Sequence, residues 1–141
     1  MGFVKSATGK SVRAIIILDG KVLLTMRDIE GGRKLALPGG DVMPGETPEA
    51  TLAREVKRET GLDVHPQTLA GVHFGETWCA AFNCEVASGE LGGDTVYMDV
   101  DEALRSKNVG ELTRLFLAGR ERALEKDAIY DMKNEGCSLY L

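Results

Sequence analysis

The run from Gly40 to Leu62, GDVMPGETPEATLAREVKRETGL, constrains the fold of this 141-residue chain more than any other segment. It opens with a glycine bend, turns through Pro44-Gly45 and then takes on the composition of a helix. Thr47 and Pro48 predict the helix start, because a threonine caps free backbone N–H groups and proline suits the first turn. Gly61 predicts the helix end. The segment therefore predicts a glycine loop that leads directly into one helix.

Two carboxylates of this helix, Glu55 and Glu59, are four residues apart, so they lie on one face, one turn from each other. Like charges at this spacing repel by a few tenths of a kcal/mol, which makes the pair unfavourable without a cation. Carboxylate oxygens beside a glycine loop suit a hard divalent cation such as Mg²⁺ held against a phosphate. For a glutamate pair taken alone, a solvated helix face is the alternative interpretation.

The same residues resemble the signature of the Nudix hydrolase family, whose fixed positions extend over a loop and a helix. The positions that match are Gly40, Glu46, Arg54, Glu55, Val56, Glu59, Gly61 and Leu62. Arg58 departs from the pattern, because it replaces the first glutamate of the usual Glu-Glu pair. The resemblance implies an α/β/α sandwich with a mixed β-sheet between helices. It also implies a metal-dependent hydrolase, in which water attacks phosphorus and cleaves the phosphoanhydride bond of a nucleoside diphosphate derivative.

The resemblance further assigns roles to single residues. Glu55, Glu59 and the carbonyl of Gly40 would bind Mg²⁺ or Mn²⁺. Glu46 would form an ion pair with Arg54 that ties the loop to the helix, and a bidentate guanidinium–carboxylate contact fixes geometry better than a lysine could. These residues are the predicted catalytic and metal-binding set.

Arg58 lowers the negative charge of the site by two relative to glutamate, so we expect weaker metal binding than the complete motif would give. Two arrangements are open. Arg58 turns to solvent or pairs with Glu55, leaving a single metal site, or it supplies positive charge directly to the substrate phosphates. The alternative function is a non-catalytic Nudix-like module that binds a nucleotide as a sensor.

Other residues near the motif are candidates for substrate contacts or for proton transfer. Arg27 and Arg33 precede the glycine loop and are candidates for phosphate contacts, with solvated loop charges as the alternative. A carboxylate must take the proton of the attacking water, and Glu59, Glu90 and Asp94 are the candidates. The sequence does not identify which nucleoside diphosphate derivative is the substrate.

The composition narrows the partners and the setting. A net charge of −5 disfavours a nucleic acid polymer but leaves small nucleotides open. No apolar run approaches the roughly 18 residues that a membrane span needs, so no membrane partner is expected. Three cysteines form no disulfide framework, which favours a reducing, cytoplasmic setting. We expect one domain over residues 1–141, and a homodimer remains open.

The rest of the chain predicts a mixed sheet covered by helices on both faces. We expect a hairpin of residues 11–18 with 21–27 through Asp19-Gly20, and further strands at 35–38, 69–74, 78–86 and 95–99. Loops are expected at 28–34 and 88–94, and helices at 101–105 and 110–129, before a loose tail at 131–141. Trp78 and Phe82 alternate along one strand face, so they either stack on a base or join the core.

Overall fold

The computed structural model describes residues 8–29, 32–75 and 77–120. Its elements in chain order are β1 (Lys10–Ile15), β2 (Ile17–Leu18), β3 (Lys21–Ile29), β4 (Gly32–Ala36), β5 (Gly39–Asp41), α1 (Pro48–Thr60), β6 (Leu62–Phe74), β7 (Trp78–Gly89), β8 (Thr95–Asp99), α2 (Val100–Arg105) and α3 (Glu111–Gly119). None of the helices in these described ranges is long and apolar enough to cross a membrane. The expected tail at 131–141 and the end of the expected helix at 110–129 lie outside the described residues.

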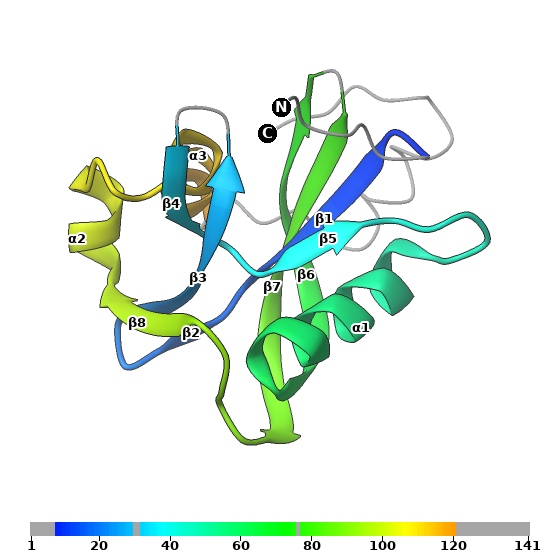
Figure 1. Cartoon of the computed structure of the whole chain (residues 1–141), viewed down its shortest axis with the longest axis horizontal. Coiled ribbons are helices and arrows are strands. Elements are labelled where there is room, and N and C mark those ends of the chain that lie inside the picture. The colour runs from blue at the N-terminus through cyan, green and yellow to red at the C-terminus, as the bar shows by residue number, and fades with distance from the viewer. Residues whose placement is uncertain (1–7, 30–31, 76, 121–141) are drawn as a thin grey trace.

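The strands form two sheets that lie next to each other (Figure 1). The first sheet has the order β5-β1-β7-β6, in which β1 and β7 run parallel and the other neighbours antiparallel. In the second sheet, β3 pairs antiparallel with β2, β4 and β8. The predicted α/β architecture with mixed pairing is therefore present, with its strands divided between two sheets.

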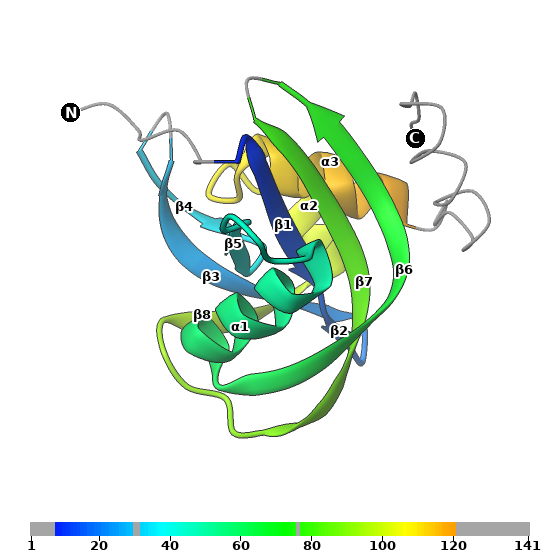
Figure 2. The ribbon, with the colours of Figure 1, turned by 90° about the vertical axis from the view of Figure 1, so that its right-hand side faces the viewer.

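The side chains at positions 12, 14 and 16 join one hydrophobic cluster and that of position 15 joins another, as the two-residue period of a strand requires. Val12 and Ala14 join the cluster that includes Leu52 and Val56 of α1. Ile15 joins the other cluster, which contains residues of α2 and α3. Figure 2 shows α1 on one face of the first sheet and α3 on the other. Because this contact fixes α1 on the sheet, it also fixes the position of the side chains that α1 carries outside the cluster.

Helix α1 begins and ends where the sequence predicts. Thr47 Oγ1 accepts a hydrogen bond from the backbone N–H of Ala50 at 3.1 Å, and Pro48 is the first helical residue. Gly61 ends the helix with a φ of +83°, in the left-handed region that favours glycine. A Cβ at this position would also collide with the carbonyl oxygen of Glu90. Both helix signals are therefore confirmed.

The predicted hairpin of residues 11–18 with 21–27 is only partly right. β2 alone pairs with β3, through the turn at Asp19-Gly20. β1 instead pairs with β5 and β7 in the other sheet, so the chain changes sheets at Ile16. The local sequence predicts the turn at Asp19-Gly20, whereas tertiary packing determines which strands pair with each other.

Residues 28–34, predicted as a loop, belong to the end of β3 and the start of β4. Asp28 pairs with Arg33 and Ile29 with Gly32 in antiparallel register. The prediction followed the charges, but an exposed strand pair is held by backbone hydrogen bonds and tolerates polar side chains. β6 and β7 are also longer than expected, and β7 takes the first two residues of the predicted loop at 88–94.

Candidate functional site

Glu46 and Arg54 tie the loop after β5 to helix α1. Arg54 Nε donates to Glu46 Oε2 at 2.9 Å, and its Nη2 donates to Oε1 at 2.8 Å. Thr51 Oγ1 and the backbone N–H of Met43 also donate to Oε1, at 2.9 and 3.2 Å. These hydrogen bonds, above all those from Arg54, lower the pKa of Glu46 to about 2. The predicted ion pair is present and bidentate.

Glu55 is held by two arginines of its own helix. Arg58 donates from Nη2 to Glu55 Oε1 at 2.7 Å and from Nε to Oε2 at 3.0 Å, while Arg54 Nη1 donates to Oε2 at 3.0 Å. The hydrogen bonds from Arg58 are the main reason that the pKa of Glu55 is lowered. Of the two arrangements open to Arg58, the structure has the pairing with Glu55.

Glu59 lies against the glycine bend and leaves one oxygen open. Its Oε1 accepts hydrogen bonds from Arg27 Nη2 at 2.6 Å and from the backbone N–H of Gly39 at 2.8 Å. Arg27 Nη2 also donates to the carbonyl of Gly39 at 2.6 Å. Within residues 8–120 as described, Oε2 of Glu59 makes no hydrogen bond. This carboxylate is therefore held in place through one oxygen while the other remains free to bind a ligand.

The glycine bend brings its backbone close to both glutamates. A Cβ at Gly40 would lie 2.7 Å from Oε1 and Cγ of Glu55, so only a glycine permits this approach. Gly39 has a φ of +152°, and a Cβ there would collide with the backbone of Val12. The two glycines thus let β5 approach α1 on one side and β1 on the other.

Arg33, Glu90 and Asp94, the other predicted residues, form no hydrogen bond or ion pair with the two helix carboxylates among the described residues. Arg33 pairs with Asp94 at 3.3 Å and with Asp28 at 3.6 Å, and all three side chains are exposed. Glu90 is exposed, and its segment packs by its backbone against the C-terminal end of α1. The structure therefore brings Arg27 to the site and leaves Arg33, Glu90 and Asp94 outside the hydrogen-bonded cluster.

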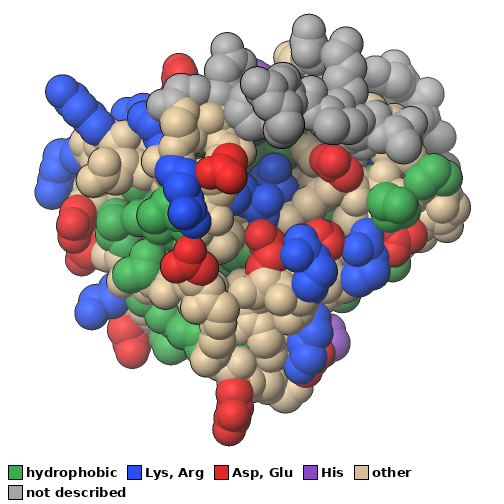
Figure 3. Space-filling model, in the orientation of Figure 1, with side chains coloured by type: hydrophobic (Ala, Val, Ile, Leu, Met, Phe, Trp, Pro, Cys, Tyr) green, Lys and Arg blue, Asp and Glu red, His purple; other side chains and the backbone are tan. Residues whose placement is uncertain are grey.

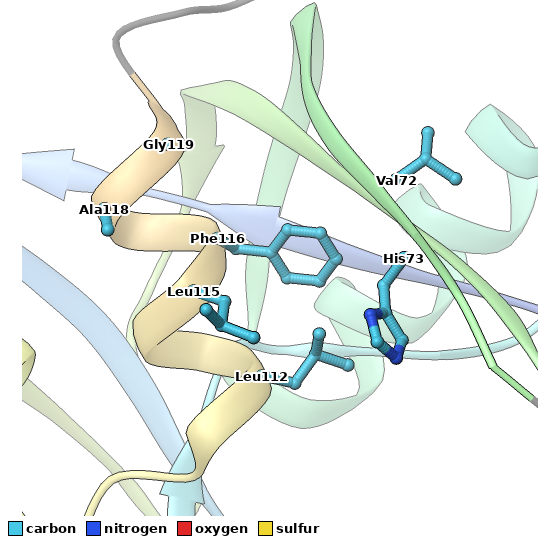
Figure 4. A pocket seen from close by; sticks show the side chains of 7 residues that line it. All are labelled: Val72, His73, Leu112, Leu115, Phe116, Ala118 and Gly119. Carbon is cyan, nitrogen blue, oxygen red and sulfur yellow. The ribbon is translucent and has the colours of Figure 1, made fainter. Parts of the chain in front are cut away.

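An apolar pocket of about 330 Å³ lies between α3 and the end of β6. Its lining consists of Val72, His73, Leu112, Leu115, Phe116, Ala118 and Gly119 (Figure 4). None of these residues belongs to α1 or to the glycine bend, so the pocket is separate from the predicted site. Trp78 and Phe82 pack against a buried cluster of Leu69, Val72 and Ala80, which supports the core interpretation for both aromatics.

Comparison with known proteins identifies the family. Residues 8–116 match the NUDIX domain, a span that includes both sheets and α1. The chain belongs to the Nudix family. Over 89 residues it is 38% identical to an ADP-ribose pyrophosphatase of Methanocaldococcus jannaschii, an alignment that covers 57% of this chain and 53% of that protein. The chain spans no more than about half the length of the curated relatives that it matches.

Solved structures share the Nudix fold. A NUDIX hydrolase from Nitrosomonas europaea has a TM-score of 0.70 at 23% identity, over 84% of this chain and 93% of that chain. The MutT protein from Methanosarcina mazei Go1 has a TM-score of 0.64 at 28% identity, over 80% of this chain and 92% of that chain. These likenesses confirm the predicted Nudix-type fold.

Nudix proteins typically depend on a divalent metal. The question for this structure is whether the oxygen atoms at the site could coordinate such an ion. Glu59 Oε2 and the backbone of the bend are oxygen donors, which suit Mg²⁺ or Mn²⁺. Both oxygens of Glu55 are occupied by guanidinium groups. In the described ranges, no group of three or more His, Cys, Asp or Glu side chains could hold a metal. The donor set therefore fits one ion, provided that Arg58 leaves Glu55.

Arg13, a half-buried residue of β1, was not among the predicted site residues, yet its Cα partner in β5 is Gly39 of the bend. It lies within the apolar run 11–18, whose composition predicts only a buried strand. A single cation inside such a run was the available signal, because charged side chains are rarely buried without a partner. Figure 3 shows basic side chains at the floor of a hollow between β3 and β5, next to the mixed charges along α1.

Proposed function

We propose that this Nudix protein is a metal-dependent pyrophosphohydrolase that cleaves the phosphoanhydride bond of a nucleoside diphosphate derivative. The observation that supports this most strongly is Glu59, whose carboxylate is held by Gly39 and Arg27 through one oxygen and keeps the other open. The related ADP-ribose pyrophosphatase of M. jannaschii is consistent with this substrate class.

Glu59, Glu55 and the carbonyl of Gly40 are the proposed ligands of Mg²⁺ or Mn²⁺. When bound, the ion would supply charge neutralisation on the phosphate oxygens and a lower pKa of a coordinated water. The Glu46–Arg54 pair has a positioning role, because it fixes the loop that carries the bend relative to the helix that carries both glutamates.

Arg58 adjusts how strongly the site binds its ion. Its guanidinium competes for the same oxygens of Glu55 that a cation would use, so binding requires Arg58 to move. Its side chain is 64% exposed, and that motion needs no change in the core. A released Arg58 then adds positive charge beside the substrate phosphates.

The proton acceptor remains one of the three predicted carboxylates. Glu59 lies in the site, whereas Asp94 is engaged by Arg33 in an exposed ion pair. Glu90 is exposed on the segment that packs on the end of α1. We therefore favour Glu59 and retain Glu90 and Asp94 as alternatives.

The direct test is turnover on a panel of nucleoside diphosphate derivatives with Mg²⁺ or Mn²⁺. Phosphate release after phosphatase treatment reports cleavage of the anhydride. We expect wild type to turn over at least one compound and Glu59→Gln to lose about 10²-fold or more of that rate. Glu49→Gln, an exposed change on the same helix, should retain it.

The rival is a sensor that binds a nucleotide without hydrolysing it. A thermal shift of wild type with panel compounds, combined with no phosphate release under any metal condition, would support the sensor. The replacement of a family glutamate by Arg58 is the observation that favours this rival.

A further inference from the structure

Arg13 is a cation without an anionic partner in the described part of the chain. Its only hydrogen bond there runs from Nη1 to the carbonyl of Val12 at 3.2 Å, and it forms no ion pair with any described carboxylate. The side chain is half-buried. A charge that is partly removed from water without a counter-charge is unfavourable. An anionic ligand bound next to Arg13 would therefore stabilise its charge.

A second arginine, Arg27, lies close to Arg13 and has a side-chain donor without an acceptor among the described residues. Arg27 donates to the carbonyl of Gly39, the residue that stands opposite Arg13 in the β1–β5 register. The pKa of Arg27 is lowered first by burial and next by the charge of Arg13. Arg27 Nε is buried and has no acceptor among the described residues. Toward the described residues, Arg27 donates hydrogen bonds only from Nη2, to Glu59 and to Gly39.

The glycine bend places these two arginines beside the proposed catalytic site. Arg13 stands opposite Gly39 in the β1–β5 register, and Arg27 donates to the carbonyl of the same glycine. Gly40, the next residue, touches Glu55. The two arginines therefore meet at Gly39, and Arg27 contacts the proposed metal ligand Glu59 directly.

Strand alternation separates Arg13 from the α1 side of the sheet. Val12 and Ala14 on either side of it pack in the α1 cluster, so Arg13 belongs to the opposite face. Arg27 comes from the second sheet and reaches Glu59 of α1. An anion that contacts both arginines would thus extend from the carboxylates of α1 across the bend.

We propose that Arg13 and Arg27 together bind a phosphate group of the substrate diphosphate beside the glycine bend. The inference rests on the proposed function for its substrate, but the anion site itself does not depend on turnover. Two adjacent guanidinium groups match phosphate oxygens in charge and in donor geometry. Phosphate binding would provide the counter-charge that Arg13 lacks among the described residues and relieve the repulsion between the two cations.

Binding of inorganic pyrophosphate in EDTA, measured by calorimetry, tests the site without metal, base or turnover. We expect wild type to bind pyrophosphate, Arg13→Gln to bind about tenfold more weakly and Arg13→Lys to fall between them. Arg105→Gln removes an exposed cation of α2 and serves as the matched control, with unchanged affinity.

A readout of stability separates binding from folding. Because Arg13 makes no ion pair among the described residues, Arg13→Gln should unfold at or above the wild-type temperature, whereas pyrophosphate should raise the unfolding temperature of wild type more than that of the variant. Equal pyrophosphate affinity in wild type and Arg13→Gln, or no binding by wild type, would overturn the inference. Binding that depends on Arg13 in a protein without turnover would leave the inference standing and refute the proposed hydrolase.

Discussion

At the scale of single residues, the arginines around each glutamate decide what that glutamate can do. The pairs are Glu46 with Arg54, Glu55 with Arg58 and Arg54, and Glu59 with Arg27. A guanidinium group occupies lone pairs of the carboxylate and stabilises its ionised form. Glu46 thereby links the loop to α1, and both oxygens of Glu55 are hydrogen-bonded to arginines. Glu59 has one oxygen, Oε2, without a hydrogen bond to any described residue.

Changing Arg58→Glu should strengthen metal binding. The change removes the hydrogen bonds that occupy Glu55 and makes the site more negative by two charges. We expect the Kd for Mn²⁺, measured by calorimetry, to fall by about tenfold or more. Arg105→Glu makes the same change of charge on exposed α2 and should leave the Kd unchanged. A metal titration of Arg58→Glu that overlays wild type would contradict the competition between Arg58 and the ion.

The Glu46–Arg54 pair should make stability depend on pH in the acid range. The pKa of Glu46 is lowered from 4.5 to about 2 in the folded protein, so its stabilising effect is complete above 4.5 and is lost as the pH falls toward 2. Glu46→Gln should therefore be less stable than wild type at pH 7, and the difference should shrink between pH 4.5 and 2. Urea unfolding of both proteins at several pH values across this range measures the difference in their free energy of unfolding. A difference that stays constant with pH would rule out the ionised pair as its cause.

At the scale of elements, the bend formed by β5 couples the sheet to α1. Gly39 faces the backbone of β1, whereas Gly40 faces the flexible side chain of Glu55. A backbone neighbour cannot yield to an added Cβ, but the end of a side chain can. The two adjacent glycines therefore serve different purposes, the first for the fold and the second for the site.

Alanine substitutions should separate these two purposes. Gly39→Ala should destabilise the protein by roughly 2 kcal/mol or more, because its φ of +152° and the close backbone of Val12 both oppose a Cβ. Gly40→Ala should remain within about 1 kcal/mol of wild type but displace Glu55 and weaken Mn²⁺ binding roughly tenfold. Urea unfolding and metal titration of both variants provide the comparison. Equal loss of stability in the two variants would argue against this division.

At the scale of the whole molecule, local sequence signals predicted the parts of the site that lie within one segment. The loop, the start of α1 at Thr47 and its end at Gly61 follow from local signals within residues 40–62. The Glu46–Arg54 pair was implied by the family resemblance of the same segment. Contacts between distant segments could not be derived in this way. Arg27 meets Glu59 from 32 residues away in the chain, and only the packing of the second sheet against α1 brings them together.

The errors in the predicted strands have the same origin. The apolar run 11–18 indicates burial but not which sheet buries it, so its division between two sheets at Ile16 was not predictable. The charged stretch 28–34 carries little hydrophobic signal, yet β3 and β4 pair along it. Arg13 was missed because it interrupts an apolar strand without belonging to a motif.

The most direct test of the central claim is an anomalous difference map from crystals of this protein grown with Mn²⁺. We predict a peak next to the carboxylate of Glu59 and the glycine bend, and its loss in crystals of Glu59→Gln. A wild-type map without a peak at this position, or a peak of undiminished height in Glu59→Gln, would contradict it.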